Sequence, residues 1–273
     1  MTQDLSITVV KLGGAEGVDF SAICKDVAEL IKQGQKLVLV HGGSAEANQL
    51  GEALGRPPRF ITSPSGYTSR YTDRATLEIF AMAVNGKVNS LLVEQLQMMG
   101  INAFGLSGVD GRLLFATRKD SIQSIENGKR IIIRDDYTGK IEQVNAGLLE
   151  TLLAGGYVPV VAPMAVSAAG EALNVDADRA AAMIASALKA ASLLLLTAVP
   201  GLMKNFPDES TLIRQLPQNK LPEALEAAQG RMKKKVLGAE EALKGGVGRV
   251  IIADGRIQNP ISNALAGNGT VIE

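Results

Sequence analysis

The sequence predicts an α/β protein in which helices cover both faces of a mainly parallel, open sheet, forming a three-layer αβα sandwich. Residues 7–12 are a short aliphatic and β-branched run that ends at Gly13 and Gly14, and residues 36–40 form a similar run that ends at Gly42 and Gly43. Such runs are typical of buried strands in a parallel sheet. Between them, apolar residues recur at helical spacing over residues 20–31, as expected of a helix that connects two parallel strands.

Composition and charge exclude several classes of partner and site. The 273 residues carry 28 Lys and Arg against 28 Asp and Glu, so nothing global favours nucleic acid or a membrane surface as a partner. The apolar runs are too short to cross a bilayer, and residues 1–6 lack the layout of a signal peptide. One cysteine, Cys24, and one histidine, His41, argue against a disulfide framework and a His/Cys metal site. We therefore expect a cytoplasmic protein.

Residues 1–172 are predicted to form the first of two lobes. Helical patterns cover residues 45–54, 73–84, 85–99 and 145–154, and strands are expected at 101–105, 113–115 and 157–162. Residues 131–133 and 141–144 look like a hairpin turned around residues 137–139. Residues 55–73 are rich in Pro, Gly, Ser and Thr, which predicts a long loop, and long loops in compact domains tend to carry function.

Residues 173–273 are predicted to form the second lobe. Helices are expected at 179–189 and 230–244, and strands at 193–196, 250–253 and 270–272. The second of these helices carries Lys233, Lys234 and Lys235 near its start, although the macrodipole at a helix N-terminus favours anions. This conflict suggests that an external anion binds there.

Two cations and the one histidine are candidates for function. Lys11 lies at the end of the first strand, where glycines allow close backbone approach and a following helix can offer N–H groups to an anion. Arg70, in the 55–73 loop, is suited to bidentate recognition of a carboxylate. The alternatives are a solvated lysine beside a tight turn and an arginine in an ordinary surface loop. We interpret His41 as an imidazole that anchors its loop, in preference to a general base.

Five motifs in register show a resemblance that covers essentially the whole chain. The segments are Lys11-Leu12-Gly13-Gly14, His41-Gly42-Gly43, Asn174-Val175-Asp176-Ala177-Asp178, Val199-Pro200-Gly201-Leu202 and Gly230-Arg231-Met232-Lys233-Lys234-Lys235. In this order and spacing they resemble the amino acid kinase family. The resemblance implies transfer of the ATP γ-phosphoryl group to a side-chain carboxylate, giving an acyl phosphate. The chain has no Gly-x-x-x-x-Gly-Lys-Ser/Thr motif, so it is not a P-loop kinase.

The resemblance also implies roles for individual residues. Lys11 and Lys235 would be catalytic, with Asp178 as the organiser of the two lysines. The acceptor would be held by Gly42, Gly43, Ser44, Arg70 and Asn174. The nucleotide would be held by Lys11, Gly13, Gly14, Thr197, Val199, Gly201, Leu202, Met232 and Lys235. Mg²⁺ is implied by the use of ATP and is expected to be held by phosphates and water, with no metal ligand from the protein.

One departure from the common family pattern bears on the substrate. In place of a short segment before the third helix, the chain has residues 65–73 after residues 57–60. Together with residues 15–17, 43–46 and 105–108, this resembles family members that phosphorylate 2-aminoadipate attached through its amino group to a small acidic carrier protein in lysine biosynthesis. The alternatives are an acetylglutamate kinase of arginine biosynthesis, a bifunctional enzyme, and a non-catalytic nucleotide-binding sensor.

The same resemblance implies a homodimer that docks this carrier protein. Because the chain is neutral overall, a surface that receives an acidic carrier must be local. The candidate cations are Arg56, Arg59, Arg74, Lys87, Arg118, Lys119, Lys129, Arg130 and Arg134. Against this, four neighbouring acidic residues could offset the charge near the expected hairpin: Asp120, Glu126, Asp135 and Asp136.

Overall fold

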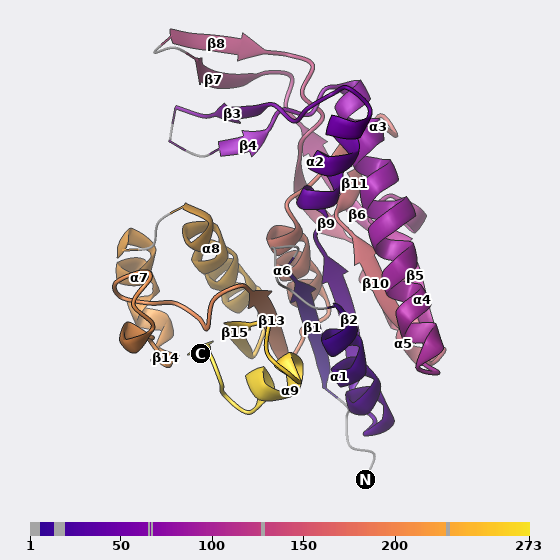
Figure 1. The fold of residues 1–273 in the computed structure, drawn as a ribbon, viewed down its shortest axis with the longest axis vertical. Helices are drawn as coiled ribbons and strands as arrows, with labels where there is room; N and C mark the ends of the chain where they lie inside the picture. The colour runs from indigo at the N-terminus through magenta and orange to yellow at the C-terminus, as the bar shows by residue number, and fades with distance from the viewer. Residues whose placement is uncertain (1–5, 14–19, 65, 67, 127–128, 228–229) are drawn as a thin grey trace.

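A computed structural model describes residues 6–13, 20–64, 66, 68–126, 129–227 and 230–273. Its framework is an eight-stranded sheet, in which every neighbouring pair is parallel except β15 and β16 (Figure 1). The strands follow in the order β14 (Gln215–Leu216), β16 (Thr270–Ile272), β15 (Arg249–Asp254), β13 (Ser192–Thr197), β1 (Ile7–Leu12), β2 (Lys36–His41), β10 (Val158–Ala162) and β5 (Ala103–Ser107).

Strand β1 lies at the point where the chain's connections diverge to the two sides of the sheet. It pairs with β2 on one side and with β13 on the other, with Val9 opposite both Val38 and Leu193. In an open parallel sheet the loops at the carboxyl ends of such strands separate and leave a crevice where ligands bind. The end of β1, which carries Lys11, is therefore placed at that position.

Helices cover both faces of the sheet, as the sequence predicted. Alternate residues of each strand face opposite sides, so Val10 and Leu12 join one apolar core while Val9 joins the other. The first core lies under α1 (Phe20–Lys32), α4 (Ser90–Met98) and α9 (Pro260–Leu265). The second lies under α5 (Ala146–Ala154), α6 (Ala177–Ala187), α7 (Leu221–Ala227) and α8 (Gly230–Lys244). Within the described part of the chain, no helix is long and apolar enough to cross a membrane.

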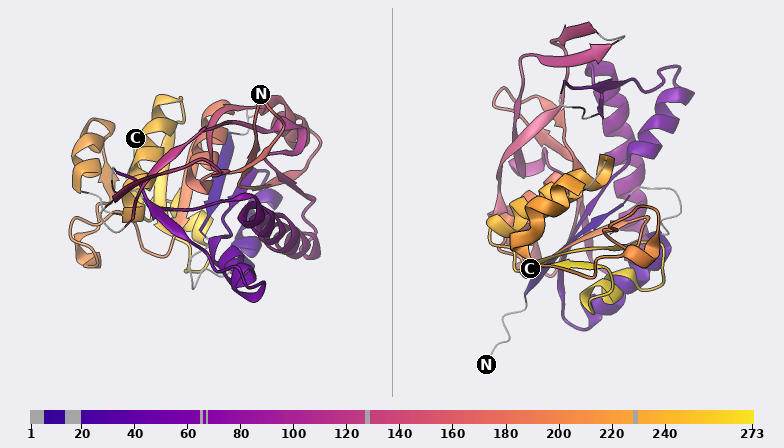
Figure 2. Two further views of the ribbon diagram at one scale, coloured as in Figure 1. Left: turned by 90° about the horizontal axis from the view of Figure 1, so that it is seen from above. Right: turned by 90° about the vertical axis from the view of Figure 1, so that its left-hand side faces the viewer.

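A second, smaller body of strands sits above the carboxyl end of β2 and β10. Its four-stranded sheet has the order β12 (Ala172–Asn174), β11 (Met164–Val166), β6 (Leu114–Arg118) and β9 (Gly139–Val144). Two hairpins project from it, β3–β4 (Phe60–Thr62 and Thr68–Arg70) and β7–β8 (Ile122–Glu126 and Lys129–Ile133) (Figure 2). Beside them run α2 (Ser44–Ala53), α3 (Arg74–Ala81) and the π-helix η1 (Met82–Asn89), which continues into α4.

Two expectations for this upper body are wrong. Residues 55–73 are not wholly loop, because they contain the β3–β4 hairpin. Residues 131–133 do not pair with 141–144: β8 pairs with β7, and β9 pairs with β6. The sequence offered no apolar alternation over residues 122–126, so the true partner of β8 was missed, and the run at residues 141–144 was chosen in its place.

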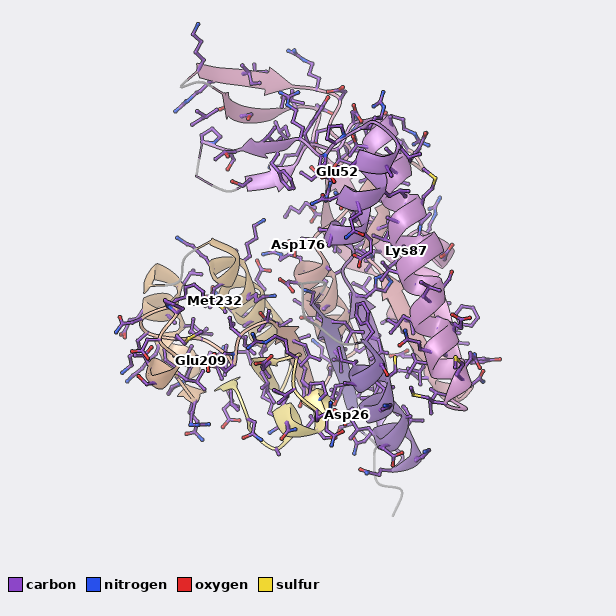
Figure 3. The ribbon with its side chains drawn as sticks, in the orientation of Figure 1. Asp26, Glu52, Lys87, Asp176, Glu209 and Met232 are labelled. Atoms are coloured by element: carbon purple, nitrogen blue, oxygen red, sulfur yellow. The ribbon has the colours of Figure 1, made fainter. Side chains whose placement is uncertain are left out.

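The last helix of the chain is capped by a residue from the first. Asp26 of α1 is buried, and its carboxylate accepts hydrogen bonds from the backbone N–H groups of Ile261 (2.6 Å) and Ser262 (2.9 Å). It also accepts from the Ser262 hydroxyl. These donors are among the unsatisfied N–H groups at the start of α9. Asp26, labelled in Figure 3, therefore joins the two ends of the chain on one face of the sheet.

Candidate active site

Lys11 is directed into the crevice by the parity of β1. It lies on the same face of the strand as Val9, toward α6, which packs against β1. Although lysine is rarely buried, Lys11 is only 8% exposed. Its ammonium group lies 3.0 Å from Oδ1 of Asp178.

Asp178 is held at the start of α6. The side chain of Asp176 caps this helix by accepting hydrogen bonds from the backbone N–H groups of Asp178 (3.0 Å) and Arg179 (3.1 Å). Figure 3 labels Asp176 at this end of α6. A carboxylate in the first helical turn is stabilised by the macrodipole, so Asp178 is favoured as an anion at this position.

Lys235 reaches the same carboxylate from α8. An ion pair between Arg179 and Glu241, 2.6 Å long, joins α6 to α8 and fixes their register. Lys235 Nζ then lies 2.8 Å from Oδ2 and 3.0 Å from Oδ1 of Asp178. One carboxylate therefore bridges two lysines from opposite sides of the crevice, as the resemblance implied for an organiser.

This trio carries one uncompensated positive charge in a poorly solvated place. Burial by itself would raise the pKa of Asp178, but the charges of Lys11 and Lys235 outweigh burial and hold that pKa well below its ordinary value. Burial lowers the pKa of Lys235, and the charge of Lys11 adds to this against the opposing effect of Asp178. A polyanion that entered the crevice would relieve the repulsion between the two ammonium groups.

Two glycines bring the backbone close to the crevice. A Cβ on Gly13 would lie 2.7 Å from the carbonyl oxygen of Leu196, so only glycine lets the end of β1 approach β13 this closely. A Cβ on Gly43 would lie 2.7 Å from a methyl carbon of Val84 on η1. Gly14 lies outside the described residues.

The expected acceptor residues gather at the end of β2. The backbone N–H of Gly42 donates to the carbonyl of Leu12 (3.3 Å), so the glycine loop borders the end of the strand that carries Lys11. Gly43 precedes α2, and Ser44 begins it. The Arg70 guanidinium donates to the Ser44 carbonyl (3.1 Å) and lies 5.4 Å from the centre of the Phe60 ring. Burial lowers the pKa of Arg70.

A buried network joins Arg70 to Asn174. Asn174 Nδ2 donates to the hydroxyl of Thr72 (3.1 Å), and that hydroxyl donates to the carbonyl of Arg70 (3.2 Å). Asp136 accepts from the backbone N–H groups of Thr72 (2.9 Å) and Thr138 (3.2 Å), and from the Thr138 hydroxyl. Asp136 is thus buried and accepts hydrogen bonds from its neighbours, so it is not part of the exposed surface near the hairpin.

Sequence reasoning did not find Thr72 or Asp136 as members of the site. The side chain that caps α3 is that of the next residue, Asp73, which accepts from the N–H of Thr76 (2.7 Å). The network forms between residues 64 positions apart, such as Thr72 and Asp136. No local pattern marks such a contact in advance.

His41 is fully buried behind the glycine loop. Its Nδ1 lies 2.6 Å from the carbonyl of Gly42, and its Nε2 lies 3.0 Å from Nδ2 of Asn89. Asn89 also donates to the carbonyl of Val160 (2.8 Å). Since the amide nitrogen can only donate, the imidazole is neutral, with its proton on Nδ1. Burial is the main cause that lowers the pKa of His41 to about 4, which agrees with an anchoring role.

The residues expected on the nucleotide side lie along the other edge of the crevice. Thr197 ends β13, and Val199 and Gly201 lie in the loop that follows. The Leu202 side chain is buried, and its N–H donates to the Thr270 hydroxyl (2.8 Å). Met232, labelled on α8 in Figure 3, is half-buried against the core under that helix.

No protein metal centre is formed by the residues that the structure describes. Among them, no three His, Cys, Asp or Glu side chains lie close enough together to hold an ion. The carboxylate nearest the crevice, Asp178, is already engaged by two lysines.

The chain combines an open α/β sheet with two lysines that bind one carboxylate, and its sequence has no P-loop motif. These features define a class of phosphotransferase in which lysines from two separate elements, here β1 and α8, neutralise phosphate charge. The model of the amino acid kinase family matches residues 6–254, and the chain belongs to this family. The family expected from the five motifs is therefore confirmed, as is the α/β fold class.

Sequence comparison identifies members of the family to which the chain is similar over almost its whole length. The chain is 58% identical to the [LysW]-aminoadipate kinase of Deinococcus radiodurans over 268 residues, which cover 98% of this chain and 92% of the relative. It is 54% identical to the enzyme of the same name from Thermus thermophilus, with 97% and 99% covered. It is 38% identical to a [LysW]-aminoadipate/[LysW]-glutamate kinase of Metallosphaera sedula, with 97% and 99% covered.

Solved structures support the same fold. An N-acetylglutamate synthase from Neisseria gonorrhoeae, complexed with coenzyme A and N-acetyl-glutamate, superposes with a TM-score of 0.79 at 27% identity. The match covers 98% of this chain and 59% of that one. A carbamate kinase from Giardia lamblia bound to AMP-PNP superposes with a TM-score of 0.68 at 17% identity, with 98% of both chains covered. The second likeness shows the fold alone.

Proposed function

We propose that this chain transfers the γ-phosphoryl group of ATP to the side-chain carboxylate of 2-aminoadipate whose amino group is attached to a carrier protein, in lysine biosynthesis. The observation that carries the proposal is the Lys11–Asp178–Lys235 trio, together with the Arg70 guanidinium held at the Ser44 carbonyl. The names of the relatives that are 58% and 54% identical support the choice of substrate.

In this mechanism a carboxylate oxygen of the acceptor attacks the γ-phosphorus. The new O–P bond forms as the bond between the γ-phosphorus and the bridging oxygen breaks, and ADP leaves with that electron pair. The acceptor is already ionised, so no general base is needed. Catalysis then depends on charge neutralisation and positioning. Lys11 stabilises the phosphoryl group in transfer, Lys235 stabilises the leaving phosphate, and Asp178 holds both ammonium groups in place.

The two halves of the chain divide the substrates between them. Residues 1–172 would bind the acceptor, with Arg70 and Asn174 at its α-carboxylate end and Gly42, Gly43 and Ser44 beside it. Residues 173–273 would bind the nucleotide through Thr197, Val199, Gly201, Leu202 and Met232. Because the Leu202 side chain is in the core, its contact would come from the backbone. Gly13 and Gly14 would supply backbone N–H groups near the phosphates.

Mg²⁺ fits this arrangement as a companion of ATP. Because no described cluster of protein ligands competes for the ion, phosphate oxygens and water would hold it. When bound, Mg²⁺ neutralises phosphate charge. We place the reaction in the cytoplasm, where ATP is available, and the single cysteine of the chain is consistent with a reducing compartment.

A kinase assay with two acceptors tests the proposal. The purified protein is given ATP with either carrier-bound 2-aminoadipate or free N-acetylglutamate, and the acyl phosphate is trapped with hydroxylamine and measured as the hydroxamate. We expect kcat/KM to be higher for the carrier-bound acceptor. A higher value for N-acetylglutamate would assign the chain to arginine biosynthesis, and absence of turnover with both would favour a nucleotide-binding sensor.

A second candidate acceptor is carrier-bound glutamate. The Metallosphaera sedula relative is named for both carrier-bound substrates, although at 38% identity it is more distant than the two relatives named for aminoadipate alone. The two acceptors differ by one methylene, which a pocket discriminates by about 10–200-fold. Carrier-bound glutamate therefore belongs in the same assay, where equal kcat/KM for both would make the enzyme bifunctional.

Among the candidate cations, those on or beside the β7–β8 hairpin are best placed to bind the carrier protein. Of the candidate cations, Arg56, Arg74 and Arg118 already pair with Asp73, Glu78 and Glu171. Within the described part of the chain, Lys119, Lys129, Arg130 and Arg134 make no recorded ion pair and are exposed. They lie on or beside β7 and β8, at the top of the molecule in Figure 1, whereas Lys87 lies on the long helix away from this hairpin (Figure 3).

The homodimer is supported by an exposed apolar face on the outer helix and edge strand. Met82, Leu91 and Met98 are 52%, 48% and 82% exposed along η1 and α4. Nearby, Phe104 of β5 packs edge to face on Tyr157 with ring centres 5.7 Å apart. Because β5 is an edge of the sheet, a second copy could cover the helix and the strand together. Met98→Asp should shift the mass measured by light scattering from dimer to monomer, whereas an unchanged dimer would place the contact elsewhere.

A further inference from the structure

Helix α8 carries three consecutive lysines near its start, Lys233, Lys234 and Lys235, and the proposed mechanism uses only the third. Lys235 turns toward the sheet and binds Asp178. Lys234 turns upward, and its ammonium group donates to the carbonyl oxygen of Thr68 at 3.4 Å. Thr68 begins β4, which lies above the N-terminal end of α8 in Figure 1. Successive helical residues point about 100° apart, so one turn of α8 can serve two separate elements.

The β3–β4 hairpin needs such outside support. Its strands are three residues long, and an isolated two-stranded hairpin is at best marginally stable in water. From one side it is held by β7, where the Ser124 hydroxyl lies 3.4 Å from the carbonyl of Thr62. Lys234 supplies a contact from the nucleotide side. Because that contact is made to a backbone oxygen, it depends on the position of the strand more than on the residue type at 68.

The hairpin also positions the acceptor arginine. Arg70 is the last residue of β4, two residues beyond Thr68, and its guanidinium donates to the Ser44 carbonyl. The second turn of α8 is thus connected to Asp178 through Lys235, and to the strand of Arg70 through Lys234. Adjacent residues of one helix link both sides of the crevice.

We propose that Lys234 is a positioning residue for phosphoryl transfer. By tying α8 to β4, it aligns the acceptor held by Arg70 with the phosphoryl group held by Lys11 and Lys235. The inference rests on the proposed function for the roles of Arg70 and Lys235. Lys234 itself would contact neither the reacting carboxylate nor the phosphates.

A pair of neighbouring variants tests the proposal. Lys234→Met removes the donor and keeps an unbranched side chain, and Lys233→Met is the matched control, because Lys233 makes no recorded hydrogen bond within the described residues. We expect Lys234→Met to raise KM for the carrier-bound acceptor by about threefold to tenfold and to leave KM for ATP within about twofold. Lys234→Arg, which retains a donor, should restore the acceptor KM.

Hydrogen exchange measured on the substrate-free protein tests the contact between Lys234 and Thr68 independently of turnover. The Tyr71 amide donates to the carbonyl of Arg59 at the base of the hairpin, so its exchange reports hairpin opening. We expect faster exchange at residues 68–71 in Lys234→Met and wild-type exchange in Lys233→Met. Equal exchange in the two variants, or an equal rise in the KM values for ATP and acceptor, would overturn the proposal. Failure of the wild type to use the carrier-bound acceptor would instead overturn the proposed function, and the exchange result would stand.

Discussion

The crevice at the centre of the large sheet and the hairpins above it are built in opposite ways. In the crevice, Lys11, Asp178 and Lys235 come from β1, α6 and α8, all of which pack into the core, and the Asp178 carboxylate pairs with both lysines. On the β7–β8 hairpin, Lys129 and Arg130 stand on exposed strands. The first arrangement is preorganised before any ligand binds, whereas the second offers charges to a partner.

This difference separates chemistry from recognition. Charge stabilisation in a transition state requires donors that are already in place and poorly hydrated. Attraction of a macromolecule requires charges that are hydrated and accessible, which mainly affect the rate of encounter and its salt dependence. Variants in the two regions should therefore differ in which kinetic constant they change.

The largest effect is expected in the crevice. Lys11→Ala and Lys235→Ala should each lower kcat by about 100-fold or more, because each removes a positive charge that would stabilise the negative charge developing on the phosphates during transfer. Thermal unfolding should show that the fold persists. Lys244→Ala, at the exposed end of α8 and paired with Glu240, is the control and should leave kcat unchanged. Near-normal turnover by either variant would remove that lysine from catalysis.

The next largest effect is expected on the free energy of unfolding, through the buried imidazole of His41. The pKa of His41 is lowered from 6.5 to about 4, so the unfolded chain binds a proton below pH 6.5 that the folded chain does not. Stability should therefore fall as pH drops from about 6.5 to 4, by up to about 3 kcal/mol. Denaturant titrations of wild type and His41→Gln measure this, and the variant should lose the dependence in that window.

Because His41 is the only histidine, NMR can check the same assignment directly. Its ring C–H signals should not titrate between pH 5 and 8. A midpoint near 6.5 would mean that the imidazole is solvated, and that it does not hold Gly42 as the neutral tautomer.

Arg70 lies at the junction of the two regions. Arg70→Lys should change the kinetics less than the substitutions of Lys11 and Lys235 do. Lysine keeps the charge but loses the planar fork and the contact over Phe60, so KM for the acceptor should rise by about tenfold. KM for ATP serves as the internal control and should not change. If the acceptor KM is unaffected, Arg70 does not bind the substrate carboxylate.

The smallest effect is expected on the exposed hairpin. Lys129→Glu with Arg130→Glu should raise KM for the carrier-bound acceptor several-fold at low salt, and the difference should shrink as salt shortens the screening length to about 8 Å or less. Arg56→Glu with Arg59→Glu tests the other part of the predicted surface. Activity on any small acylated acceptor should be insensitive to both pairs and to salt. Equal salt sensitivity for small and carrier-bound acceptors would argue against a dedicated carrier surface.

The contrast also explains what could be predicted from the sequence. The sheet could be predicted because buried strands have continuous apolar runs. The grouping of Lys11, Asp178 and Lys235 could be predicted because each lies in one of the family motifs. The hairpins were not, since a three-residue strand such as β3 has no periodicity to detect. Asn89 was missed because it lies inside a helical pattern, where the π-turn that aims it at His41 has no signature in the sequence.

The central position of β1 has a consequence for synthesis on the ribosome. Val9 of β1 pairs with Leu193 of β13. One edge of β1 therefore stays unpaired until β13, which lies in the last third of the chain, has been synthesised. At about 5–20 residues per second, that edge stays open for roughly ten to forty seconds. An aliphatic strand with a free edge pairs readily with other chains. Nascent molecules stalled before residue 192 should therefore be the species that most needs a chaperone.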